Sequence, residues 1–81
     1  MFYVYILKSL KNGRYYIGYA QNIERRLQEH NSGETKGNKY FGPFELVYKE
    51  KYEDPALARK REYYLKSQKS RKFIDALING A

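Results

Sequence analysis

Two tyrosine-rich segments near the start of the sequence could bring a pair of phenol hydroxyls together. Tyr5 lies within FYVYIL, and Tyr16 lies within RYYIGY shortly after it. Such a pair can be ordinary packing with satisfied hydroxyls. It can also handle a proton, provided that a neighbouring group or a metal-bound water activates one phenol. Taken alone, the pair leaves both interpretations open.

The segment NIERRLQEHNSG adds an arginine and a histidine on one side of a helix predicted over residues 23–31. At about 100° per residue, Ile23 and Leu27 form an apolar stripe, and Arg26 and His30 lie beside it. These two polar side chains are therefore expected to turn toward the sheet. The opposite, solvent-facing side is expected to carry Glu24, Arg25, Gln28 and Glu29.

Arg26 and His30 can each be interpreted as structural residues or as residues that take part in chemistry. An arginine in an ERR run is usually solvated, but Arg25 takes that role here. Arg26 could instead hold a phosphate through two parallel hydrogen bonds. His30, the single histidine of the sequence, could cap the helix C-terminus, or it could orient or deprotonate a water.

The segment ARKREYYL belongs to another predicted helix, over residues 55–67, which starts at Asp54-Pro55 as N-cap and first residue. Glu62 is expected at the margin of its apolar stripe, and Arg61 near the centre, with its stem along the core and its charge in solvent. The residues expected to face the core are Leu57, Ala58, Tyr64 and Leu65.

Glu62 stands in a strongly basic neighbourhood and could simply form salt bridges with it. It could also anchor one Mg²⁺, which binds through one or two carboxylates plus substrate phosphate and keeps most of its waters. Because the sequence has no cysteine and a single histidine, any metal must be held by oxygen.

The two tyrosine-rich segments predict an antiparallel hairpin around Asn12-Gly13. A two-residue turn there would place Tyr5 opposite Ala20, whereas a longer loop would place Tyr5 opposite Tyr16. Both registers keep Tyr5 and Tyr16 on one face of the sheet.

The remaining elements complete a small α+β domain. Residues 31–43 are rich in Gly and Lys without a period, which predicts a mobile loop. Residues 44–52 predict a third strand, in which Phe44, Leu46 and Tyr48 alternate with Glu45 and Lys49. Ser70 is expected to cap a last helix that buries Phe73, Ile74, Leu77 and Ile78.

Size and charge limit the function classes. The chain has 81 residues, which is enough for one domain over residues 1–81. Its 16 Lys and Arg against 9 Asp and Glu give a net charge of +7, which favours a polyanionic partner such as nucleic acid. No apolar run is long enough to span a membrane, and we expect a cytoplasmic protein without a membrane partner.

With these segments assembled in order, the sequence resembles a small single-domain bacterial member of the GIY-YIG endonuclease superfamily. The resemblance covers nearly the whole chain, through YVYIL, RYYIGY, NIERRLQEHNSG, ELVY and ARKREYYLKS. It implies a three-stranded antiparallel sheet flanked by about three helices. It also implies hydrolysis of a nucleic-acid phosphodiester with one divalent metal ion, Mg²⁺ or Mn²⁺. Together with the net charge, it leads to the hypothesis of a nuclease that cleaves DNA, with selection among DNA structures as part of the hypothesis.

The resemblance assigns roles to the residues singled out above. Tyr5 would hydrogen-bond within the site, Tyr16 would be the candidate general base, and Gly18 would let substrate or a helix approach the strand closely. Of the polar groups on the helices, Arg26 would stabilise the transition-state charge and His30 would position or activate the attacking water. Glu62 would hold the metal.

Substrate contacts and alternatives complete the expectations. Backbone contacts to nucleic acid, DNA rather than RNA, are expected from Arg25, Lys36, Lys39 and Arg71, and a partner protein could supply specificity. Tyr3, Tyr15 and Tyr19 are expected to serve packing or the substrate surface. One alternative is a non-catalytic nucleic-acid-binding module on the same fold. Another is a protein-interaction adaptor that uses Tyr40 and Phe41.

Overall fold

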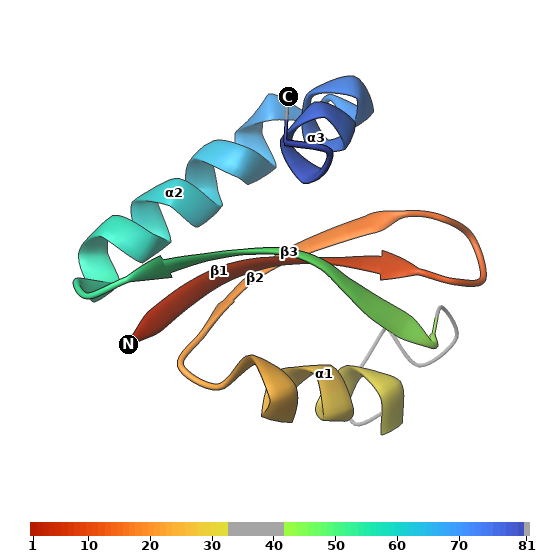
Figure 1. The fold of residues 1–81 in the computed structure, drawn as a ribbon, viewed down its shortest axis with the longest axis horizontal. Coiled ribbons are helices and arrows are strands. Elements are labelled where there is room, and N and C mark those ends of the chain that lie inside the picture. Colours follow the sequence, from red (N-terminus) through yellow and green to blue (C-terminus); the bar gives the residue numbers. More distant parts are fainter. Residues whose placement is uncertain (33–41, 81) are drawn as a thin grey trace.

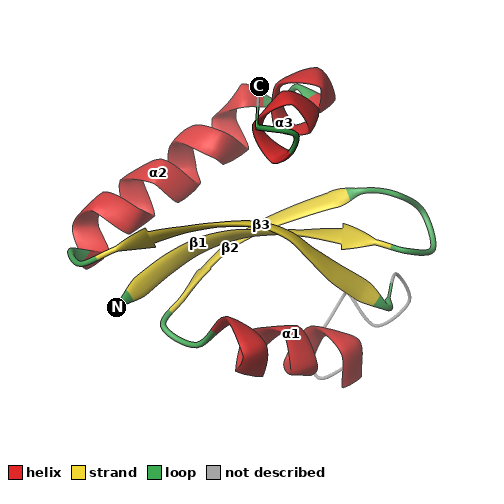
Figure 2. Ribbon diagram, viewed as in Figure 1, coloured by secondary structure: helices red, strands yellow, loops and turns green. Residues whose placement is uncertain are grey.

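The described part of the chain places one antiparallel sheet between two layers of helix. The computed structural model describes residues 1–32 and 42–80. The elements of this part are, in chain order, β1 (Phe2–Ser9), β2 (Tyr15–Ala20), α1 (Ile23–Ser32), β3 (Phe44–Tyr52), α2 (Pro55–Gln68) and α3 (Arg71–Ile78). The strand order is β2-β1-β3. Helix α1 covers one face of the sheet, and α2 and α3 lie over the other (Figure 1 and Figure 2). The predicted α+β class, with three strands and helices around them, is confirmed.

The hairpin of β1 and β2 pairs in a register that neither predicted turn gives. Tyr5 lies opposite Gly18, and Leu7 lies opposite Tyr16. Both predicted registers are therefore wrong. The observed register differs from each predicted register by an even number of residues, so every side chain stays on the face of the sheet that was predicted for it. The prediction that Tyr5 and Tyr16 share a face is confirmed.

The turn between the two strands is built around a buried serine. Ser9 is fully buried, and its hydroxyl oxygen accepts hydrogen bonds from the backbone amides of Lys11 and Asn12, each at 3.2 Å. Gly13 has a φ of 74°, in the left-handed region that glycine enters without steric cost. The turn therefore contains more residues than Asn12 and Gly13 alone. The pairing of β1 with β2 differs for this reason from the register predicted for a two-residue turn.

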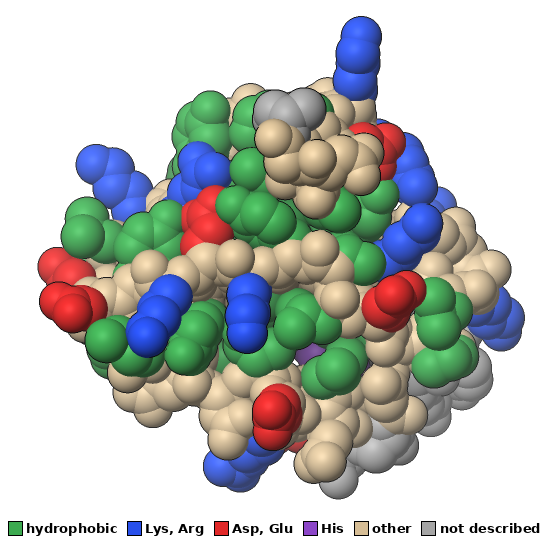
Figure 3. All heavy atoms as spheres, viewed as in Figure 1, with side chains coloured by type: hydrophobic (Ala, Val, Ile, Leu, Met, Phe, Trp, Pro, Cys, Tyr) green, Lys and Arg blue, Asp and Glu red, His purple; other side chains and the backbone are tan. Residues whose placement is uncertain are grey.

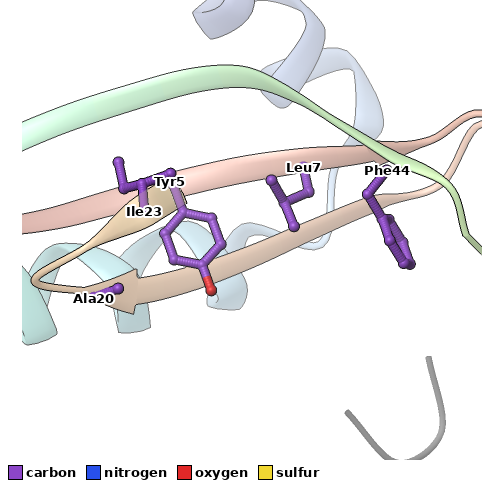
Figure 4. Packing of buried hydrophobic residues seen from close by; sticks show 5 residues of the cluster. All are labelled: Tyr5, Leu7, Ala20, Ile23 and Phe44. Carbon is purple, nitrogen blue, oxygen red and sulfur yellow. The ribbon is translucent and has the colours of Figure 1, made fainter. Parts of the chain in front are cut away.

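Each face of the sheet has its own hydrophobic cluster, because successive strand residues point to opposite faces. Val4 and Tyr5 are neighbours in β1 and belong to different clusters. The cluster on the α1 face consists of Tyr5, Leu7, Ala20, Ile23 and Phe44 (Figure 4). The cluster on the α2 and α3 face is centred on Val4, Ala58 and Leu65.

The helices begin where the sequence indicates. Asn22, Asp54 and Ser70 each accept a hydrogen bond from a backbone amide in the first turn of the following helix, at 2.9 to 3.2 Å. Pro55 is the first residue of α2, where a missing N–H has no consequence. The predicted N-caps are confirmed.

Strand β3 contains an irregularity that the sequence pattern does not reveal. Its register against β1 shifts between Ile6, which pairs with Tyr48, and Leu7, which pairs with Leu46. Such a bulge moves the side chains that follow it to the other face. Phe44 and Leu46 therefore share the α1 face, whereas Tyr48 points toward α2. The prediction that all three lie on one side is wrong for Tyr48.

The buried side of α2 is narrower than predicted. Ala58 and Leu65 are buried, as expected, but Leu57 is 54% and Tyr64 is 45% exposed. The prediction that Leu57 and Tyr64 face the core is therefore wrong. The buried contact of α2 is centred on Ala58 and Leu65, which pack with Val4 of β1.

Arg61 also departs from its prediction, because its charge does not extend into solvent. Its Nε and Nη2 atoms donate to the two carboxylate oxygens of Glu50 at 3.0 and 3.1 Å. The hydroxyls of Tyr48 and Tyr52 donate to the same carboxylate at 2.5 and 2.7 Å. Burial alone would raise the pKa of Glu50, but these hydrogen bonds outweigh it and hold that pKa below its usual value. Burial and the hydrogen bond to Glu50 raise the pKa of Tyr52 to about 12.

Candidate active site

A cleft of about 880 Å³ runs along β2. Because β2 is an edge strand, helices on both faces of the sheet can reach the space beside it. Tyr5, Tyr16, Arg26 and His30 belong to the α1 side, and Glu62 comes from α2 on the other side. All six residues that the sequence singled out for the chemistry or for its backbone setting line this cleft: Tyr5, Tyr16, Gly18, Arg26, His30 and Glu62.

Tyr5 crosses the neighbouring strand at Gly18. The residue is 2% exposed, and its ring is directed from β1 toward β2 (Figure 4). A Cβ atom on residue 18 would lie 2.9 Å from Cε1 of Tyr5 and nearer still to Cζ and the hydroxyl oxygen. Only glycine fits there unless the ring moves. The close approach predicted at Gly18 is thus made by the Tyr5 ring rather than by a helix.

Tyr16 and His30 meet at one aromatic residue. Tyr16 lies edge-on to Phe44, with ring centroids 5.1 Å apart, and His30 lies 5.7 Å from the same ring. Phe44 is buried and gives both side chains a fixed support. Sequence reasoning treated Phe44 only as a strand residue, so this connection was missed.

The imidazole of His30 is biased toward its neutral form. Burial lowers its pKa, the nearby charge of Arg26 lowers it further, and Glu29 opposes the shift in part. A neutral imidazole has one nitrogen able to accept a proton. His30 can therefore act as an acceptor near neutral pH.

Arg26 lies at the rim of the cleft between a phenol and a carboxylate. Hydrogen bonding to the Tyr5 hydroxyl raises the pKa of its guanidinium most, and Glu29 adds to the shift. Nη1 of Arg26 donates to Oε2 of Glu29 at 3.2 Å. About half of the side chain, 49%, is exposed. The guanidinium is thus held in place with an open side from which it can bind an anion.

Glu29 was expected on the solvent side of α1, and this prediction is only half right. Its side chain is 24% exposed, because it pairs with both Arg26 and Arg25, the latter at 3.3 Å. The carboxylate thereby helps to orient Arg26.

Glu62 offers a carboxylate to the cleft from α2. Its side chain is 22% exposed, and its Oε2 atom lies 3.1 Å from Nζ of Lys66. In the described residues no group of three or more His, Cys, Asp or Glu side chains forms a metal cage. A single carboxylate with room for water and phosphate fits Mg²⁺ or Mn²⁺, since Mg²⁺ does not require an all-protein cage. It does not fit a structural zinc site.

The predicted backbone contacts to nucleic acid fall in different places. Arg25 is exposed and pairs with Glu29, and it is not among the residues that line the cleft. Arg71 lies over the ring of Tyr15, at 4.7 Å from its centroid, and donates to the carbonyl oxygen of Gly13 at 2.8 Å, so much of its bonding capacity is used within the fold. Lys36 and Lys39 lie outside the described residues, as do Tyr40 and Phe41.

On one face of the molecule the positive charge is spread rather than gathered. On the face shown in Figure 3, Lys and Arg side chains stand around the edge and across the middle, with acidic side chains between them. Among the described residues that line the cleft, by contrast, three basic side chains (Arg26, Arg59 and Lys66) accompany one carboxylate, that of Glu62. The cleft is the more specific candidate for binding a polyanion.

Sequence reasoning missed three cleft residues on α2. Arg59, Tyr63 and Lys66 line the cleft together with Glu62. The four are spaced i, i+3, i+4 and i+7, which is one face of a helix. The spacing of these polar residues along α2 indicates that they share one face, and this was the signal in the sequence. The apolar stripe, on which the prediction was based, does not include them.

The hairpin also has an unexpected tie to the last helix. The hydroxyl of Tyr15 donates a hydrogen bond to Oδ1 of Asp75, and this bond is the largest cause of a raised pKa of Tyr15. Tyr15 precedes Tyr16 in β2, so α3 helps to anchor the strand that carries Tyr16. Sequence spacing gave no sign of this long-range contact.

The structure is a small α+β domain with a cleft lined by tyrosine, arginine, histidine and glutamate, and comparison with known proteins identifies the family. A model described as the GIY-YIG catalytic domain matches residues 1–74. The match covers most of the chain, and this protein belongs to the GIY-YIG catalytic domain family, a family of nucleases. The resemblance inferred from the motifs is confirmed.

Individual relatives agree with the family assignment. The chain is 39% identical over 79 residues to a UPF0213 protein of Staphylococcus saprophyticus, covering 96% of this chain and 95% of the relative. It is 46% identical over 69 residues to a UPF0213 protein of Clostridium perfringens, covering 82% and 71%. The solution NMR structure of a UPF0213 protein from Bacillus halodurans superposes with a TM-score of 0.60 at 36% identity, covering 98% of this chain and 84% of that one.

Among the described residues, no helix combines the length and the apolar character needed to cross a bilayer.

Proposed function

We propose that this protein is a metal-dependent endonuclease that hydrolyses phosphodiester bonds in DNA, with residues 1–81 acting as a single domain. The proposal rests on one observation, which is that side chains from both faces of the sheet meet in the cleft beside β2. Tyrosine, arginine, histidine and glutamate together provide the groups that phosphodiester hydrolysis needs: proton acceptors, an anion ligand and an oxygen ligand for a cation.

Tyr16 and His30 are the proton-handling pair of this proposal. Both rest on Phe44 at ring distances of 5.1 and 5.7 Å, so they lie at the same end of the cleft. His30, with its lowered pKa, can accept a hydrogen bond from the attacking water and orient it. Tyr16 is the candidate general base that takes a proton in the hydrolytic step.

Arg26 and Tyr5 form the anion-binding part. The Arg26 guanidinium, oriented by the Tyr5 hydroxyl and by Glu29, can donate hydrogen bonds to the non-bridging phosphate oxygens. Charge grows on these oxygens in the transition state, so a donor already in place lowers the barrier.

Glu62 is the proposed ligand of the metal ion. Mg²⁺ or Mn²⁺, when bound, would supply charge stabilisation for the leaving oxygen. Glu62 lies on α2, so the cation and the proton-handling groups approach the scissile phosphate from different faces of the sheet. Arg25 and Arg71, with Lys36 and Lys39, are proposed to contact the DNA backbone outside the reacting phosphate.

Cleavage assays test the proposal directly. Purified protein is incubated with branched, single-stranded and duplex DNA in Mg²⁺ or Mn²⁺. We expect cleavage of at least one substrate, loss of cleavage in EDTA, and a reduction of about 10²-fold or more in Tyr16→Phe and Glu62→Gln proteins.

Matched variants separate chemistry from folding. Tyr3→Phe removes the hydroxyl of a half-buried tyrosine on the same face of the sheet outside the cleft, and Glu45→Gln neutralises the carboxylate of an exposed residue on β3. Both are expected to cleave like the unmodified protein. DNA binding without cleavage of any substrate would instead support a non-catalytic binding module.

A further inference from the structure

Lys66 occupies the place where a cation would bind to Glu62. Its Nζ atom lies 3.1 Å from Oε2 of Glu62, and both residues line the cleft. The carboxylate is 22% exposed, whereas the lysine side chain is 54% exposed. The lysine is thus the more exposed member of the pair and the glutamate the more buried one.

An ammonium group and a divalent cation compete for the same carboxylate oxygens, because each carries positive charge and each needs the same lone pairs. Lysine carries its charge on a flexible stem with four carbons, so it can leave the carboxylate without moving the helix. Once displaced, its ammonium remains within the cleft that also contains Arg26 and Arg59. An ammonium in such a basic cleft attracts an anion, and under the proposed function that anion is a substrate phosphate.

We propose that Lys66 is a switchable positioning residue: it holds the Glu62 carboxylate before the metal binds, and it transfers to the substrate phosphate when a metal takes that carboxylate. This inference rests on the proposed function. It predicts that metal and nucleic acid bind with positive coupling, since each favours the same position of Lys66. By thermodynamic reciprocity, the metal raises nucleic-acid affinity by the same factor as nucleic acid raises metal affinity.

The competing explanation is an ordinary Glu-to-Lys pair along a helix, which would support α2 and nothing else. The two explanations differ in the predicted metal affinity. If Lys66 competes with the cation, its removal strengthens metal binding; if it only supports the helix, metal binding stays the same or weakens.

The test is Mn²⁺ binding measured by electron paramagnetic resonance or calorimetry, with no DNA present. We expect Lys66→Met to bind Mn²⁺ about two- to fivefold more tightly than the unmodified protein, the range of a partly exposed ion pair. Lys60→Met, an exposed residue of the same helix outside the cleft, is the matched control and should not change the affinity. Circular dichroism checks that both variants keep the fold.

A second measurement completes the test. DNA affinity is measured with and without Mn²⁺ on the cleavage-deficient Tyr16→Phe background. We expect Mn²⁺ to raise the affinity in that background, and the Lys66→Met change to reduce this enhancement about two- to fivefold.

The possible failures can be told apart. If Mn²⁺ binds, and binding is lost in Glu62→Gln, but Lys66→Met behaves like Lys60→Met, the role of Lys66 is overturned and the proposed metal site stands. If the unmodified protein shows no Glu62-dependent Mn²⁺ binding, the proposed metal site is wrong and the role of Lys66 falls with it.

Discussion

The two faces of the sheet use their tyrosines and charges in opposite ways. On the α2 face, Glu50 accepts hydrogen bonds from Arg61, Tyr48 and Tyr52, so its carboxylate is fully engaged within the fold. On the α1 face, Arg26 keeps about half of its side chain exposed while Tyr5 and Glu29 orient it. One face has a closed polar network, and the other has an oriented but open one.

Whether a polar network is closed or open distinguishes a structural cluster from a candidate site, and the types of residue present do not. Both faces contain tyrosine, arginine and glutamate. Arg61 uses two donors on one carboxylate and is 30% exposed, whereas Arg26 lies at the rim of the cleft and is 49% exposed. Arg26 is therefore the more accessible of the two to an anion. Residue composition alone would not distinguish the two.

The largest expected effect lies in the apolar contact beneath α2. Leu65 is 1% exposed, so Leu65→Ala should lower the free energy of unfolding by about 3 kcal/mol, through lost burial and the cavity left behind. Leu57→Ala, on the same helix but 54% exposed, should cost less than about 0.5 kcal/mol. Urea titrations followed by circular dichroism measure both. Equal effects would contradict the observed orientation of α2.

The closed network gives the next largest effect. Glu50→Gln leaves Arg61 without its carboxylate, and we expect a loss of about 2 kcal/mol in unfolding free energy. Metal-dependent cleavage below the melting temperature should be unchanged, because Glu50 is not part of the cleft. A large loss of cleavage without a loss of stability would contradict the purely structural role assigned to Glu50.

The close packing of Tyr5 on Gly18 predicts a smaller effect on stability with a change in activity. In Gly18→Ala the added methyl group displaces the Tyr5 ring, at a cost of about 1 to 2 kcal/mol. Because Tyr5 orients Arg26, cleavage should fall as well. The double variant Gly18→Ala with Tyr5→Ala removes the clash, so the two changes should be non-additive in unfolding free energy. Additive effects would argue against this contact.

The smallest effect is a pH dependence of stability at high pH. The pKa of Tyr52 is raised to about 12 from an ordinary value near 10, so folding favours the neutral phenol. Its contribution is fully present below about pH 10 and is lost as pH rises through about 12. In Tyr52→Phe, the fall in melting temperature over this window should be shallower. An unchanged slope would show that other groups dominate alkaline unfolding.

Local features were predicted well because they depend on near neighbours in the sequence. The N-caps at Asn22, Asp54 and Ser70 follow from side chains that can accept a hydrogen bond from the next turn. The shared face of Tyr5 and Tyr16 follows from strand parity, which survives an even error in register. The family resemblance depended on the order of several such local segments.

The errors in β3 and α2 share a cause, which is that they depend on contacts distant in sequence. The β3 bulge moved Tyr48 to the α2 face, where it joins Glu50 and Arg61. The exposure of Leu57 reflects how little of α2 the twisted sheet covers. No periodicity within a single segment carries this information.

The sequence by itself determined which chemical groups are present, which elements carry them, and that Tyr5, Tyr16, Arg26 and His30 lie on one side of the sheet. Only the tertiary structure decided that Glu62, from a helix on the other side, reaches the same cleft, since this depends on β2 being an edge strand. It also decided that Gly18 makes room for Tyr5 and that Lys66 lies on the Glu62 carboxylate. Propensity and periodicity act over a few residues, whereas strand order and helix placement result from burying both faces of one sheet at once.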